Sequence, residues 1–152
     1  MNAFDAQKAS DRPSSALPPG RHFLALAPLE PRILRRIVDQ AHARKAARAG
    51  RPKGAVDDDA PLAEQVLAML FEKPSTRTRV SFDMSMLQLG GSAIVLISAD
   101  LQFGRGETVA DTARVLAGYV DGVRLRTFSP ETLDEMASHA TVPVINGRTD
   151  RS

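Results

Sequence analysis

Apolar stretches alternate with amphipathic ones along most of the chain, and this alternation predicts an α/β fold. The apolar stretches are nearly continuous, which is typical of strands that are covered on both faces of a parallel sheet. The predicted strands are residues 66–71, 93–97, 122–128 and 142–145, and the predicted helices are residues 28–49, 76–89, 109–120 and 130–140. Strands separated by helices imply βαβ units, so we expect a four-stranded parallel sheet with helices on both faces.

The start of the chain differs from the rest. Residues 1–20 are polar and rich in Ser, Pro and Ala, which predicts a disordered leader followed by one folded domain at 21–152. The helix predicted at 28–49 carries apolar residues on one face and arginines on the other. The segment that follows, 50–61, is rich in Gly, Pro and Asp and predicts an exposed loop.

Composition excludes several classes of protein. The chain has 152 residues, of which 43% are hydrophobic, enough for one domain with a core. A net charge of +2, one Tyr and no Trp argue against nucleic-acid binding. No apolar stretch approaches the roughly 20 residues needed to span a bilayer, and the first residues lack a basic segment followed by an apolar core, so we expect no signal peptide and no membrane contact. The absence of Cys fits the cytoplasmic protein that we expect. Without Cys and with scattered His, the sequence predicts no metal and no cofactor.

The most informative segment, residues 71–79, reads Phe-Glu-Lys-Pro-Ser-Thr-Arg-Thr-Arg. It follows a predicted strand and opens a predicted helix, where unpaired amides and the positive end of the helix dipole attract anions. Hydroxyl groups and a guanidinium fork suit phosphate oxygens, so the segment predicts a phosphate site. A structural alternative stays open: Ser75 is only a helix cap, and Arg77 and Arg79 are solvated.

The predicted sheet adds further donors at the same rim. Ligands of open parallel sheets bind at the carboxyl ends of the strands. Besides residues 75–79, those ends carry Gln102, Arg126 and Asn146. We therefore expect donors from several strand ends to converge on one anion.

The string Ser-Thr-Arg-Thr-Arg after Phe-Glu-Lys-Pro resembles the carbamoyl-phosphate motif of the aspartate/ornithine carbamoyltransferase family. The similarity extends over about residues 21–152 and is strongest in the motif itself. Weaker matching segments, in the family's order, are residues 21–24, 102–108, 111–116, 121–126 and 142–147. The resemblance implies the carbamoyl-phosphate-binding half of a two-domain carbamoyltransferase.

The resemblance also implies roles for individual residues. The implied substrate-binding set is Ser75, Thr76, Arg77, Thr78, Gln102 and Arg126. Within it, Thr78 and Arg126 would also reach the carbamoyl oxygen and act in catalysis, and Gln102 would act across a subunit boundary. Donors held at that oxygen stabilise the negative charge of the tetrahedral intermediate.

Structural alternatives exist for several of these side chains. Arg126 would pair with Glu72, and Gln102 would be an ordinary loop residue. For Arg79 we favour a buried ion pair that supports the turn over contact with ligand. For Glu107, Asp111 and Arg114 we favour ion pairs over chemistry.

The choice of co-substrate rests on a few positions. Lys73, Gln102 and Gly106 resemble the ornithine enzymes more than the aspartate enzymes, which implies citrulline formation in arginine biosynthesis by a homotrimer. In the family, a His-Pro-x-Gln motif and an amino-acid-binding second domain follow the segment that this chain matches. We therefore expect these 152 residues to be inactive alone. Two other functions remain open: a non-catalytic module that binds phosphate, and a module for oligomerisation.

Overall fold

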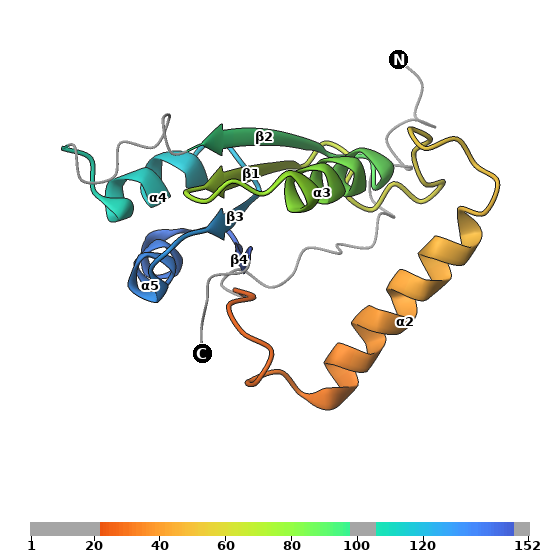
Figure 1. Ribbon diagram of the computed structural model, residues 1–152, viewed down its shortest axis with the longest axis horizontal. Coiled ribbons are helices and arrows are strands. Elements are labelled where there is room, and N and C mark those ends of the chain that lie inside the picture. The colour runs from red at the N-terminus through yellow and green to blue at the C-terminus, as the bar shows by residue number, and fades with distance from the viewer. Residues whose placement is uncertain (1–21, 98–105, 148–152) are drawn as a thin grey trace, which may run out of the picture.

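The fold is built on one parallel sheet, which a computed structural model describes for residues 22–97 and 106–147. The strands are β1 (Val66–Phe71), β2 (Ser92–Ile97), β3 (Gly122–Arg126) and β4 (Val144–Asn146). They lie in the order β2-β1-β3-β4, and each neighbouring pair is parallel. The prediction of a four-stranded parallel sheet is confirmed, and Figure 1 shows the arrows of β1, β2 and β3 ending at the same edge.

Helices cover both faces of this sheet because the side chains of β1 alternate between them. Ala68 and Leu70 face α4 (Val109–Ala117) and α5 (Pro130–His139) in the larger hydrophobic core. Leu67 and Met69 face α3 (Thr76–Gln88) in a second core with Met86. The strand is therefore apolar at every position, whereas β2 lies at the edge of the sheet and leaves Ile94 and Ile97 about half exposed.

The strands at the other end of the sheet are shorter than the sequence predicts. β3 ends at Arg126 instead of residue 128, because Thr127 and Phe128 turn to bind the Glu72 carboxylate. β4 begins at Val144, where its amide donates to His22 Nδ1 over 3.0 Å. Here Phe23 extends the sheet by an isolated parallel bridge to β4.

Two of the helices against the sheet are capped by their own side chains. At α5, Ser129 Oγ accepts a hydrogen bond from the Thr132 amide at 3.2 Å, which confirms the predicted cap. At α4, Thr108 Oγ1 accepts from the Asp111 amide at 3.0 Å. These caps satisfy amides that would otherwise lack an acceptor.

Helix α2 (Pro31–Ala47) stands apart from the sheet (Figure 1). It begins at Pro31 rather than residue 28, because the backbone of Glu30 is extended and Pro is favoured in the first helical turn. None of its residues is buried, and Ile37 and Val38 on its apolar face are 45% and 49% exposed. Within the described residues, no helix is long and apolar enough to cross a bilayer.

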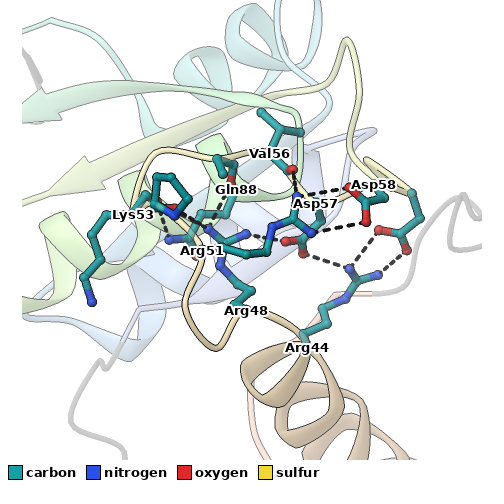
Figure 2. Close-up of polar contacts among 11 residues, drawn as sticks. Arg44, Arg48, Arg51, Lys53, Val56, Asp57, Asp58 and Gln88 are labelled. Atoms are coloured by element: carbon teal, nitrogen blue, oxygen red, sulfur yellow. Dashed lines mark hydrogen bonds and ion pairs between the residues drawn. The ribbon is translucent and has the colours of Figure 1, made fainter.

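The end of α2 is attached to the domain by arginine–aspartate pairs in the loop that the sequence predicts at 50–61 (Figure 2). Arg44 donates to Asp57 at 3.0 Å and to Asp59 at 2.7 Å, and Arg48 also binds Asp57. Arg48 in addition donates to the Ala55 carbonyl at 2.8 Å. The loop is therefore ordered by charge pairs.

Backbone bonds fasten the same loop to the end of α3. The Asp57 amide donates to the Gln88 carbonyl at 2.7 Å, and the Leu62 amide donates to the Leu89 carbonyl at 2.9 Å. The Gln88 side chain returns a bond to the Lys53 carbonyl at 2.9 Å. This end of α2 is thus tied to the sheet domain through the loop.

The charge pairs make the stability of this loop depend on pH. Burial raises the pKa of Asp57, but hydrogen bonds and positive charge from Arg48 and Arg44 lower it more, to below its ordinary value of 3.8. The hydrogen bond from Arg44 likewise lowers the pKa of Asp59. A carboxylate with a depressed folded-state pKa contributes its full stability above 3.8, and that contribution is lost as the pH falls through the folded-state value.

We therefore expect Asp57→Asn to lower the midpoint of urea unfolding at pH 7, because Arg48 and Arg44 lose their shared anion. The deficit relative to the unaltered chain should shrink as the pH is lowered below the ordinary Asp pKa of 3.8, where Asp57 itself becomes protonated. Glu135→Gln serves as the control, since Glu135 is exposed on α5 and forms no ion pair with a described residue. A deficit that stayed constant with pH would contradict the assignment.

Candidate anion-binding site

A pocket of about 460 Å³ lies at the connection between the end of β1 and the start of α3. Its lining residues are Pro74, Ser75, Thr76, Arg77, Thr78 and Arg126. The first five come from the loop and first turn that follow β1, and Arg126 is the last residue of β3. The structure thus brings two distant segments of the chain to one pocket, which contains four of the hydroxyl- or guanidinium-bearing residues of the motif.

The pairing of β1 with β3 places Arg126 beside the motif. In this parallel pair, Phe71 lies opposite Arg126. The ladder continues past the end of β1, because the Glu72 amide donates to the Arg126 carbonyl at 2.9 Å. The backbone at this corner is therefore held by the sheet itself, and the Arg126 side chain starts from a fixed position.

The first turn of α3 differs from those of α4 and α5 because no side chain caps it. Ser75 occupies the position before the helix, but its hydroxyl donates to Thr78 Oγ1 at 2.7 Å and makes no capping bond. The first helical backbone bond joins the Arg79 amide to the Ser75 carbonyl at 2.9 Å. The earlier amides have no acceptor within the helix, so they remain available to an anion in the pocket.

The charge at this helix end is also suited to an anion. The first turn of α3 contains no acidic residue, whereas the first turns of α4 and α5 contain Asp111 and Glu131. Acidic side chains normally neutralise the positive end of the dipole. Here that end carries Arg77 and lies beside Arg126, and the polar side chains among the described lining residues are hydroxyls and guanidinium groups.

The hydrogen bonds exclude a capping role for the Ser75 side chain and a Glu72–Arg126 pair, whereas the exposure of Arg77 and Arg79 agrees with the alternative that these two arginines are solvated. Ser75 does not act as a side-chain cap. The Glu72 carboxylate accepts from the Thr127 hydroxyl and from the Phe128 amide at 3.1 Å, and not from Arg126. Arg126 Nε is buried without a hydrogen-bond partner among the described residues. An oxyanion that binds in the pocket would supply the hydrogen-bond acceptor that this buried N–H group lacks.

Other predicted residues had different outcomes. The expectation of a buried ion pair for Arg79 is wrong, because Arg79 is exposed and forms no ion pair with a described residue; it lines a separate pocket of about 660 Å³. Asn146 Nδ2 donates to the Leu24 carbonyl at 2.9 Å, and Asn146 does not line the anion pocket. Asp111 pairs with Arg114 at 2.9 Å, as expected. Gln102 lies outside the described residues.

One residue of this region was missed by sequence reasoning. Arg124 lies on β3 two positions before Arg126, is completely buried, and has two guanidinium nitrogens without a partner among the described residues. The signal was present in the sequence: a charged residue inside an apolar strand, at the spacing that places it on the same face as Arg126. Within the described part of the chain, no group of acidic, His or Cys side chains is arranged to hold a metal ion.

Comparison with known proteins agrees with the geometry of the pocket. The sequence profile described as "Aspartate/ornithine carbamoyltransferase, carbamoyl-P binding domain" matches residues 21–152. The ornithine carbamoyltransferases of Cereibacter sphaeroides and Roseobacter denitrificans are each 58% identical to the chain over 131 residues, which is 86% of this chain and 42% of theirs. The structure of the ornithine carbamoyltransferase from Pyrococcus furiosus superposes with a TM-score of 0.78 at 44% identity, covering 88% of this chain and 41% of that one.

The coverages show how much of each protein is similar. The chain matches its curated relatives over nearly all of the part that the structure describes, yet it spans only 42% of their length. What is compared is therefore one domain.

We expect Glu72→Ala to reduce the free energy of unfolding by about 1–3 kcal/mol, because the buried Thr127 hydroxyl and the Phe128 amide lose their acceptor. Glu72→Gln should reduce it less, since the amide oxygen remains. Urea unfolding of the single variants, of Thr127→Val and of the double variant tests the coupling. Additive losses from Glu72→Ala and Thr127→Val would contradict a direct bond between the two side chains.

Proposed function

Because the chain belongs to the aspartate/ornithine carbamoyltransferase family, as its carbamoyl-phosphate-binding domain, we propose that its pocket binds carbamoyl phosphate for transfer of the carbamoyl group to ornithine. The observation that carries the proposal is the uncapped start of α3 facing Arg126 across a pocket with no acidic lining. Such a pocket selects an oxyanion by charge and by its donors.

The phosphate end of the substrate is proposed to lie against the first turn of α3. There the backbone amides, that of Ser75 included, and the Thr76 hydroxyl supply donors, and Arg77 supplies the matching charge. The Ser75–Thr78 hydrogen bond fixes the rotamers of both hydroxyl-bearing side chains before a ligand arrives. A site organised in this way loses little side-chain entropy on binding.

The carbamoyl end is proposed to face Thr78 and Arg126. In the reaction, the neutral amine of the co-substrate attacks the carbamoyl carbon and forms a C–N bond, and charge accumulates on the carbonyl oxygen. The bond from carbon to the phosphate oxygen then breaks, phosphate departs with the electron pair, and the proton lost by the amine is taken up by the released phosphate. Thr78 and Arg126 donate to the charged oxygen, and loss of one such donor typically reduces the rate by about 10²–10³-fold.

The finer assignment rests on the relatives. Those named above are ornithine carbamoyltransferases, which supports ornithine over aspartate as the co-substrate and a place in arginine biosynthesis. We extend the proposal to a cytoplasmic homotrimer in which Gln102 of one subunit contributes to the site of its neighbour. The part of the relatives' length that this chain does not span is proposed to bind the amino acid.

Binding is tested by titration calorimetry with carbamoyl phosphate and with inorganic phosphate. We expect Arg77→Ala and Arg126→Ala each to weaken the binding of carbamoyl phosphate at least tenfold, because a charge-assisted bond to an oxyanion contributes about 1.5–3 kcal/mol. The matched control is Arg36→Ala, since Arg36 is exposed on α2 and is not among the residues that line the pocket. Equal loss in all three variants would reduce the effect to net charge and would contradict a defined site.

A second measurement tests whether this chain binds carbamoyl phosphate without catalysing the transfer. We expect the 152-residue chain to bind carbamoyl phosphate without forming citrulline when ornithine is added, because the lining of the pocket has no carboxylate to bind the ammonium groups of ornithine. A colorimetric assay for citrulline is sufficient. Turnover above the uncatalysed rate, abolished by Arg126→Ala, would show that the chain carries the whole active site.

A further inference from the structure

Arg124 is the largest fully buried side chain of the described structure. It lies in the middle of β3, opposite Met69 of β1 and Ile145 of β4. The strand's other buried side chains, those of Val123 and Leu125, point to the opposite face and belong to the core under α4 and α5. A charged side chain is rarely buried to this extent unless an acidic group pairs with it.

No acidic group pairs with Arg124 in the described part of the chain. Its guanidinium lies between two aromatic rings, 4.5 Å from the centroid of Phe71 and 4.8 Å from that of Phe82. Nη2 donates to the Gly147 carbonyl at 2.8 Å, whereas Nε and Nη1 have no hydrogen-bond partner among the residues that the structure describes. Cation–π contacts and one hydrogen bond offset part of the desolvation, and the positive charge itself is not neutralised.

Gly147 is fitted to this guanidinium. A Cβ atom at position 147 would lie 2.4 Å from Arg124 Nη2 and 2.5 Å from Cζ, so any larger residue would displace the side chain. The Gly147 amide is bonded to the Leu125 carbonyl at 2.7 Å, which fixes the backbone on the other side. The backbone at Gly147, directly after β4, therefore fixes the position of the Arg124 guanidinium.

Arg124 and Arg126 form a column of positive charge that leads to the pocket. Residues two apart on a strand lie on the same face, about 7 Å apart along it. Burial and, as the smaller cause, the charge of Arg126 together lower the pKa of Arg124 to about 10. At neutral pH the guanidinium is nonetheless charged, and it repels Arg126 until an anion binds between Arg126 and the start of α3.

We propose that Arg124 is a positioning residue of the anion pocket, a buried second cation whose charge acts behind Arg126 to raise the affinity for the phosphate group at the expense of the stability of the empty domain. The proposal rests on the pocket being the anion site proposed above. It goes further in assigning part of the binding energy to a side chain that does not line the pocket.

Three substitutions separate charge from shape. Arg124→Met fills the space between Phe71 and Phe82 without charge, and sulfur packs well against aromatic rings. Arg124→Gln is also neutral and keeps an N–H donor for the Gly147 carbonyl. Arg124→Lys keeps the charge on a flexible stem. The readouts are the dissociation constants of inorganic phosphate and of carbamoyl phosphate by calorimetry, and the urea midpoint with and without phosphate.

We expect both neutral variants to bind either anion about tenfold more weakly, and the Lys variant to stay within about threefold of the unaltered chain. The empty Met variant should be at least as stable as the unaltered chain, because an uncompensated buried charge is removed. The increase in urea midpoint produced by phosphate should accordingly be smaller in the neutral variants. A merely structural role for Arg124 would instead lower stability and leave affinity unchanged.

The outcomes distinguish this proposal from the one on which it rests. If the unaltered chain binds neither anion, the pocket is not an anion site and both proposals fail. If the unaltered chain binds and the Met and Gln variants bind equally well, only the role of Arg124 is overturned. Should Arg124→Met fail to fold, Arg124→Gln against Arg124→Lys decides the question alone, since the two differ in charge and both retain a donor.

Discussion

The parallel pairing of β1 with β3 is the constraint on which the rest of the structure depends. It sets Phe71 opposite Arg126 and continues through the Glu72 amide, so the motif after β1 and the end of β3 meet at one corner. The central position of both strands, with β2 and β4 outside them, buries their apolar side chains on both faces. Because the corner is fixed by backbone bonds within a packed core, the donors around it do not depend on a flexible loop for their placement.

The same corner shows how binding capacity is obtained at the expense of stability. Helices α4 and α5 satisfy their first amides with Thr108 and Ser129 and carry acidic residues beside them. Helix α3 has neither, and two arginines of β3 stand behind it without acidic partners among the described residues. An isolated domain designed for stability alone would neutralise these charges. That Arg124 is buried and Arg126 half-buried without acidic partners among the described residues is the physical sign that this end of the sheet is arranged for an anion.

Much of this arrangement was predictable because it follows from local rules. The buried strand 66–71 and the helix after it were predicted to within one residue, since continuous apolar and amphipathic patterns are decided locally. The donors of the motif and Arg126 were named as one site. The errors lie where a distant segment determines the local structure. β3 ends early because Thr127 donates a hydrogen bond to Glu72, and Arg79 is exposed rather than paired. The apolar face of α2 was read correctly, yet its periodicity says nothing of whether a partner covers it.

By itself the sequence determined the class of fold, the order of its elements and the chemistry of the motif, because periodicity, turn residues and side-chain types are properties of neighbouring positions. Only the tertiary structure decided which polar groups are used within the protein and which are left for a ligand. In the folded chain the Ser75 hydroxyl donates to Thr78, and the Glu72 carboxylate accepts from Thr127 and Phe128. Arg124 and Arg126 have no anionic partners among the described residues. The physical reason is that hydrogen-bond partners and burial are set by contacts between distant segments, which no local pattern encodes.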